Sequence, residues 1–210
     1  MLDAKVRGLT RVCNFRRSEG WTVPNVVVGT LWFVWFVSWW ASANWSSTPL
    51  KRAGIRRELP NRIVTILGAY GLFARLPARV DPQWLDLRGH VVLAWAMIAL
   101  VALGFAFTWW ARIHLGRLWS ATVTRKPDHH VVDTGPYAVV RHPIYTGIIA
   151  AAIGTALVRG YVLSFAGAAL MTLGFYLKAR LEEEFLRGEL GREAYDAYAR
   201  RVPMLIPLAA

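Results

Sequence analysis

Two short polar segments hold most of the residues whose types could do chemistry. The first, "TGPYAVVRHPIY" (134–145), places Arg141 and His142 among two prolines and two tyrosines, just before an apolar stretch. The second, "ARLEEE" (179–184), contains one arginine and three consecutive glutamates. Each has a simpler explanation, because arginine and tyrosine anchor helices at membrane interfaces and a run of acids is usually a solvated helix face. If the two segments meet, their charges of both signs and their aromatic rings predict a concave binding site.

Several common kinds of site are absent from the sequence. It contains no G-x-G-x-x-G after a strand, no phosphate-binding loop, no H-E-x-x-H and no G-x-S-x-G. His129 and His130 are flanked by Asp128 and Asp133, but neighbouring side chains diverge and no further ligands are evident, so we predict no metal site. The single cysteine, Cys13, excludes an internal disulfide and a cysteine-rich zinc site.

The elements that must position these segments belong to a membrane protein. The 210 residues are 55% hydrophobic and only 18% charged, and they include eleven tryptophans. No charged residue occurs from 22 to 50 or from 91 to 110, and each run reaches the roughly 20 apolar residues that a spanning helix needs. Basic residues precede the first run, as in a secretory signal. It is too long for one, however, and has tryptophans in place of a small-residue cleavage site, so we expect it to stay in the mature protein.

Shorter apolar runs at 144–158 and 161–177 are separated by two residues and predict a tight C-terminal helical hairpin. The run 63–72 is a weaker candidate for a span. The expected fold class is therefore an all-α integral membrane protein of about five transmembrane helices, with four spans as the alternative. We expect residues 1–60 to form an N-terminal arm, a first transmembrane helix and a loop, and residues 61–210 to form the core.

The net charge of +12 points to lipid head groups rather than nucleic acid, because the basic residues are spread over all connecting segments. Segments 51–62, 112–141 and 178–201 carry sixteen of the 25 lysines and arginines, and nine lie elsewhere. The positive-inside rule makes the side with sixteen cytoplasmic. Four-span and five-span arrangements give the same count, and both place 112–141 and the C-terminal tail in the cytoplasm.

The loop 112–143 and the tail after 178 are expected to fold together. The loop is too long for a simple turn, and long loops of this kind are usually functional or disordered. The tail continues the last helix, and Leu181 with Phe185, then Leu186 with Leu190, lie four apart and give it a partly apolar face. A face of this kind needs a partner outside the bilayer, and the loop is the candidate.

Gly160, Gly167 and Gly174 recur every seven residues along the hairpin. Small residues on one stripe let helices approach closely. Packing explains these glycines, and we assign them no chemistry.

The order of motifs over residues 112–207 resembles the isoprenylcysteine carboxyl methyltransferase family and its phospholipid methyltransferase relatives. The resemblance is carried by "HHVVDTGPYAVVRHPIYTG" and then "RLEEEFLRGELGREAYDAYARRVPMLIP". Each piece is short, but the sequence of G-P-Y, R-H-P-x-Y-x-G, a hairpin, E-E, Y-x-x-Y and R-V-P is specific in combination. The resemblance implies an integral membrane enzyme that uses S-adenosylmethionine, with its cofactor site in the cytoplasmic loop and tail. Residues 1–60 carry no such resemblance.

The resemblance also implies roles for individual residues. The cofactor contacts fall on His129, His130, Val131, Val132, Tyr137, His142, Pro143, Tyr145, Glu182 and Glu183. A basic residue just before the acidic pair positions substrate in the family, and here either Lys178 or Arg180 fits that place. Arg117, in "LGRLWS", resembles a further basic position that faces cofactor or substrate.

These residue types suit the cofactor, which carries a sulfonium cation, an amino-acid zwitterion and an adenine. Aromatic rings hold the cation, arginine or histidine pairs with the carboxylate, and Glu182 or Glu183 binds the ammonium or the ribose hydroxyls. Methyl transfer then depends mainly on holding nucleophile and methyl group in line at short distance. A carboxylate acceptor is already ionised at neutral pH, whereas an amine needs a base, for which His142 or a glutamate is the candidate.

The expected function is S-adenosylmethionine-dependent methyl transfer to a lipid-like, membrane-embedded acceptor, above all a carboxylate such as that of an isoprenylcysteine. Phospholipid or other lipid N-methylation is the first alternative. A membrane lipid or sterol reductase using NADPH is the second, and a membrane-binding protein without turnover is the third. Membrane lipids and a lipid-like or prenylated acceptor are the expected partners.

Overall fold

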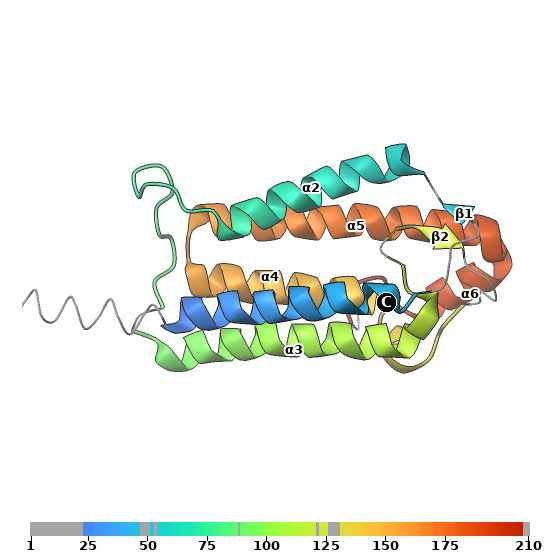
Figure 1. Ribbon diagram of the computed structural model, residues 1–210, viewed down its shortest axis with the longest axis horizontal. Helices are drawn as coiled ribbons and strands as arrows, with labels where there is room; N and C mark the ends of the chain where they lie inside the picture. The colour runs from blue at the N-terminus through green and yellow to red at the C-terminus, as the bar shows by residue number, and fades with distance from the viewer. Residues whose placement is uncertain are drawn as a thin grey trace, which may run out of the picture.

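The computed structural model describes residues 23–46, 51–52, 54–87, 89–120, 122–125 and 131–207. In this part of the chain, long helices run along one axis and the shorter elements gather at one end (Figure 1). The elements are the helix Val23–Ala41, η1 (Ser42–Asn44), β1 (Lys51–Arg52), α2 (Ile55–Phe73), α3 (Val91–Leu115), η2 (Gly116–Leu118), β2 (Thr124–Arg125), η3 (Gly135–Ala138), α4 (Pro143–Arg159), α5 (Val162–Leu190) and α6 (Arg192–Arg201).

The helices form two groups that meet between α4 and α5. One group pairs α2 with α5, and the other packs α3 on α4, with the helix Val23–Ala41 alongside them (Figure 1). β1 and β2 pair antiparallel, Lys51 opposite Arg125, and join two loops at the end of the bundle that carries α6. This short ladder is the one departure from the expected all-α fold among the described residues.

Three described helices are long and apolar enough to cross a bilayer, Val23–Ala41, Val91–Leu118 and Val162–Glu189. The predicted all-α membrane fold is confirmed. The predicted hairpin is also confirmed, because α4 and α5 are separated only by Gly160 and Tyr161. α4 is apolar but has 17 residues, and α2 is not among the three, so the number of spans stays a prediction. The predicted division between residues 60 and 61 falls inside α2.

Tryptophans on one face of the helix Val23–Ala41 hold it against α3 and α4. Trp32 Nε1 donates to Thr155 Oγ1 of α4 (2.9 Å), and Trp35 Nε1 donates to Thr108 Oγ1 of α3 (2.8 Å). Both threonines are fully buried. Each hydrogen bond satisfies a polar group that has no water in the bundle interior, and together they fix the rotation of this helix.

The predicted packing role of the glycines is confirmed for two of the three. A Cβ on Gly167 would overlap the backbone of Gly71 and Leu72, and one on Gly174 would overlap Thr65. Gly160 lies in the turn between α4 and α5 with a positive φ of 72°, and it packs against a loop rather than a helix, because a Cβ there would overlap the backbone of Leu85. Glycine adopts this conformation without the steric penalty that a side chain brings.

We expect Gly167→Ala to lower the stability of the protein by about 1–3 kcal/mol, because an added methyl in a close-packed contact forces the backbones of α2 and α5 apart. Gly29→Ala is the matched control, since a Cβ at this helical glycine meets nothing within 4 Å. Thermal unfolding in detergent, followed by tryptophan fluorescence, measures both variants. Equal midpoints for Gly167→Ala and Gly29→Ala would contradict the packing role.

Candidate functional site

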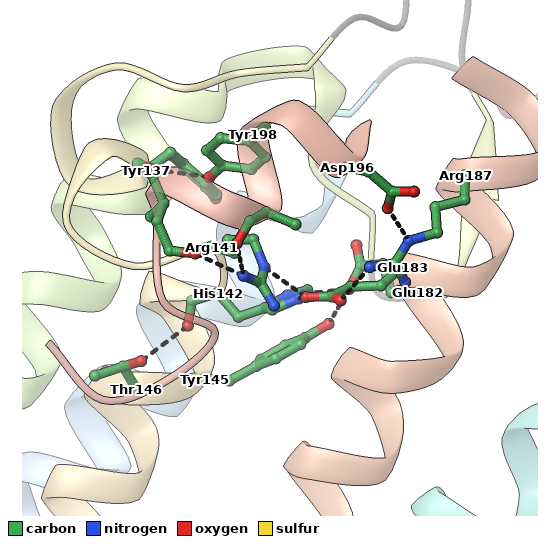
Figure 2. A network of polar contacts seen from close by, with 12 residues as sticks. Tyr137, Arg141, His142, Tyr145, Thr146, Glu182, Glu183, Arg187, Asp196 and Tyr198 are labelled. Atoms are coloured by element: carbon green, nitrogen blue, oxygen red, sulfur yellow. Dashed lines mark hydrogen bonds and ion pairs between the residues drawn. The ribbon is translucent and has the colours of Figure 1, made fainter. Parts of the chain in front are cut away.

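The loop before α4 and the C-terminal tail are joined by hydrogen bonds at one end of the bundle. Arg141 N donates to Pro203 O (2.9 Å), and His142 N donates to Met204 O (3.1 Å). The Tyr198 hydroxyl donates to Tyr137 O (2.7 Å), as Figure 2 shows. Gly191, with a φ of 95°, ends α5 and allows α6 to turn back. The predicted folding of the tail onto the loop is therefore confirmed.

Arg141 connects three segments through one side chain. Its Nε lies 2.7 Å from Glu183 Oε1 of α5, and its Nη1 donates to Ala199 O (2.9 Å) and Val202 O (2.6 Å) at the end of α6 (Figure 2). The last carbonyls of a helix have no partner within the helix, so this guanidinium caps α6 while it pairs with the buried acid. An interfacial anchor would not need these contacts, so Arg141 is a structural link between the loop, α5 and α6.

The adjacent glutamates of α5 have different environments. Glu183 is only 2% exposed and accepts from Arg141 Nε (2.7 Å), His142 Nε2 (3.2 Å) and Arg187 Nη2 (3.3 Å). Glu182 is 32% exposed and accepts a hydrogen bond from the Tyr145 hydroxyl (2.7 Å). Neighbouring residues on a helix project about 100° apart. Glu183 therefore supports the network from behind, and Glu182 faces the cavity described below.

A cavity of about 240 Å³ opens beside this network. Its polar lining includes Tyr137, Arg141, His142, Tyr145, Lys178, Glu182, Tyr195 and Tyr198. Its apolar lining includes Trp39, Leu115, Leu118, Ile148 and Phe175. A concave surface with an apolar wall and a few convergent polar groups is typical of a ligand site.

Stacked rings form one wall of the cavity. The His142 and Tyr145 rings are 5.3 Å apart and nearly parallel, and the Tyr145 and Phe175 rings are also 5.3 Å apart. Lys178 Nζ lies 5.3 Å from the centre of the Tyr145 ring. This packing fixes the side-chain orientations before any ligand arrives, which is what a precise site requires.

The tyrosines from the loop and tail remain hydrogen-bond donors. Burial raises the pKa of the hydroxyls of Tyr137, Tyr195 and Tyr198 above the ordinary value. All three stay protonated at neutral pH, so they add donors to the cavity and no charge.

Most of the residues implied by the resemblance line this cavity, namely Val131, Val132, Tyr137, His142, Pro143, Tyr145, Glu182 and Lys178. Glu183 lies behind it, in contact with His142 and Arg141. Arg180 is exposed and donates to the Tyr176 hydroxyl (3.2 Å), and Arg117 is also exposed; neither lines the cavity. His129 and His130 lie outside the described residues.

Among the described residues, no group of three His, Cys, Asp or Glu side chains is placed to hold a metal ion. The chemistry available at the cavity comes from charged, aromatic and hydroxyl groups.

Arg112 links the first helix to the loop, and the sequence did not predict this role. It is fully buried and lies between the rings of Trp45 (5.0 Å) and Trp119 (4.5 Å). It donates to Ser42 O (3.0 Å), Trp45 O (2.8 Å) and Gly116 O (2.7 Å). It thereby ties the end of the first helix to the start of the loop. In the sequence it counts only as the first charge after an apolar run, so no local signal sets it apart.

Tyr195, Tyr198 and Trp39 also line the cavity without a role assigned from sequence. The two tyrosines belong to the Y-x-x-Y element, whose spacing of three places them on one helix face. Trp39 comes from residues 1–60, where no motif was recognisable.

Part of the chain is similar to known proteins. Residues 97–187 match the Isoprenylcysteine carboxyl methyltransferase (ICMT) family. The protein-S-isoprenylcysteine O-methyltransferase of Schizosaccharomyces pombe is 33% identical over 100 residues, 47% of this chain and 42% of that protein. A probable protein-S-isoprenylcysteine O-methyltransferase of Oryza sativa subsp. indica is 33% identical over 111 residues, 52% of each chain.

A protein with a different name also matches. The nickel-cobalt-cadmium resistance protein NccN of Alcaligenes xylosoxydans xylosoxydans is 30% identical over 130 residues, 60% of this chain and 54% of that protein. In all three cases the match spans about half of the relative's own length.

The matched region contains the greater part of α3, all of α4 and most of α5. It therefore includes Tyr137 and His142 of the loop and Tyr145 of α4, which line the cavity. The resemblance seen in the sequence is thus confirmed, and residues 97–187 carry the pattern of the isoprenylcysteine carboxyl methyltransferase family.

Proposed function

We propose that this protein transfers the methyl group of S-adenosylmethionine to a lipid-like acceptor, in the first place a carboxylate such as that of an isoprenylcysteine. One observation carries the proposal. The family motifs before α4 and near the end of α5 line a single cavity at the end of a bundle of apolar helices. The charge count of the sequence favours a cytoplasmic location for this end.

The polar end of the cavity fits the cofactor. Arg141 has no hydrogen bond from Nη2 to any described residue and lines the cavity, so this nitrogen is the donor for the carboxylate of the cofactor. Glu182 supplies the opposite charge for the ammonium or the ribose hydroxyls. The aromatic side chains that line the cavity suit a sulfonium cation. When bound, S-adenosylmethionine supplies a methyl group on positively charged sulfur.

The remaining lining residues fit an acceptor with a charged head and an apolar chain. Lys178 lies one helical turn before Glu182 on α5, so the two share a face of the helix. Its ammonium group is the natural partner of a carboxylate head, and Phe175 and Ile148 line the same cavity for the chain. A carboxylate is ionised at neutral pH and needs no general base. Lys178 would bind and orient the acceptor, and in-line positioning would supply most of the rate.

A calorimetric titration with S-adenosylhomocysteine in detergent tests the cofactor assignment. We expect saturable binding to the wild type. We expect affinity about tenfold lower for His142→Ala, because this change removes the ring stacked on Tyr145 and a partner of Glu183. His90→Ala is the matched control. His90 is exposed and lies at the N-terminal end of α3, whereas the cavity lies at the C-terminal end of that helix.

A folded wild type that does not bind S-adenosylhomocysteine would refute the proposed cofactor. A parallel titration with NADPH distinguishes the reductase alternative, which predicts binding of NADPH and not of S-adenosylhomocysteine.

A further inference from the structure

Three tryptophans share one face of the helix Val23–Ala41, spaced three and four residues apart. The indole N–H groups of Trp32 and Trp35 are used inside the bundle, on Thr155 and Thr108. Trp39 is different. Its Nε1 donates to no described residue, and Trp39 is the residue of this helix that lines the cavity.

The ring of Trp39 is fixed in place by its neighbours. It stacks on Trp35 with ring centres 5.1 Å apart, and it meets Trp109 and Trp119 edge to face at 5.6 and 5.5 Å. A partly buried indole held this firmly has little freedom to turn toward another acceptor. Its Nε1 is not one of the fully buried side-chain atoms that lack a partner, so the N–H group is accessible and a ligand in the cavity can accept its hydrogen bond.

The chemistry of the donor restricts the ligand. An indole N–H only donates, and a lysine ammonium also only donates. Trp39 and Lys178 line the same cavity together with the apolar side chains of Phe175 and Ile148. An acceptor head that carries oxygen acceptors, such as a carboxylate or an amide carbonyl, can accept hydrogen bonds from both groups. A protonated amine nitrogen satisfies neither.

We propose that Trp39 is a specificity-determining residue of the acceptor site. Its ring bounds the apolar part of the cavity, and its indole N–H donates a hydrogen bond to an oxygen of the acceptor's head group. The inference rests on the proposed function and extends it to a residue outside the region that matches the family, 97–187. Selection of the acceptor is therefore assigned in part to the N-terminal helix of this chain.

The test uses the purified full-length protein, methyl-labelled S-adenosylmethionine and N-acetyl-S-farnesylcysteine, a small prenylated cysteine with a free carboxylate. We expect Trp39→Phe, which keeps a ring and removes the donor, to raise the KM for this acceptor about tenfold. The kcat and the affinity for S-adenosylhomocysteine should stay within about twofold, since uniform binding of the acceptor affects KM alone. Trp40→Phe is the control, because Trp40 is the next residue of the helix and is 74% exposed.

The possible results separate this inference from the proposed function. The role of Trp39 is overturned if Trp39→Phe has the KM of the wild type, or if its affinity for S-adenosylhomocysteine falls as much as its KM rises. Neither result contradicts the proposed function. A wild type that binds S-adenosylhomocysteine and does not methylate the probe also overturns the role of Trp39. A wild type that does not bind S-adenosylhomocysteine refutes the proposed function itself. If Trp39→Phe does not fold, Trp39→Leu also lacks the donor and gives the same readout.

Discussion

Glu183→Gln is expected to destabilise the protein by about 3 kcal/mol, because it removes the charge that faces a nearly buried arginine. Glu183 is 2% exposed and Arg141 is 10% exposed, with 2.7 Å between the carboxylate and Nε. The same carboxylate also accepts from His142 and Arg187. Glutamine keeps the shape of the side chain but leaves Arg141 without its buried counter-charge. Since Arg141 also caps α6, we expect the tail to lose its fixed position and S-adenosylhomocysteine binding to be abolished.

Glutamine substitutions at the three consecutive glutamates compare their effects on binding and on stability. Glu182→Gln should weaken S-adenosylhomocysteine binding about tenfold and change stability by less than about 1 kcal/mol, because this acid is partly exposed and lines the cavity. Glu184→Gln should change neither, because its ion pair with Arg57 is exposed on both sides and such pairs contribute about 0–1 kcal/mol. Unfolding in detergent and calorimetry measure the series. Identical effects of the Glu182 and Glu183 substitutions would contradict the division of roles.

Much of the fold could be predicted because the bilayer restricts what a chain can do. Uncharged runs must be helices, since no other open structure satisfies its backbone in lipid. The two-residue gap between 158 and 161 forces α5 to return alongside α4. The apolar face of the tail, near Leu186, requires a partner, and the loop is the nearest one. These conclusions depend on periodicity and length, which the sequence displays directly.

The candidate site was harder to predict because its contacts link distant segments. Nothing local distinguishes Glu183 from Glu182; their difference arises from the position of Arg141 on another element. Trp39 likewise depends on how the first helix is rotated, which the hydrogen bonds of Trp32 and Trp35 determine.

The spacing along the helix does distinguish Lys178 from Arg180. Residues four apart share a helix face and residues two apart do not, so Lys178 belongs with Glu182 and Arg180 points elsewhere. The structure places them in this way, with Lys178 at the cavity and Arg180 against Tyr176.

Lys178→Met is expected to lower kcat/KM for a prenylated carboxylate acceptor about 100-fold, the effect of removing one partner from a desolvated charge pair. Methionine keeps a long apolar side chain, so packing against Tyr145 is retained and only the ammonium group is lost. Because Glu182, Arg141 and His142 are unchanged, the affinity for S-adenosylhomocysteine should stay within about twofold. Arg180→Met is the control on the same helix, and we expect activity close to that of the wild type.

The measurement is methyl transfer from labelled S-adenosylmethionine to N-acetyl-S-farnesylcysteine, followed by treatment with base. A methyl ester is hydrolysed by base and releases volatile methanol, whereas an N-methyl group is stable, so the product identifies the nucleophile. An active Lys178→Met would mean that Lys178 does not bind the carboxylate of the acceptor. Base-stable label on membrane lipids would then favour the amine acceptor. That reaction needs a group to remove a proton, which Lys178, as a cation, would hinder and which Glu182 or His142 would have to supply.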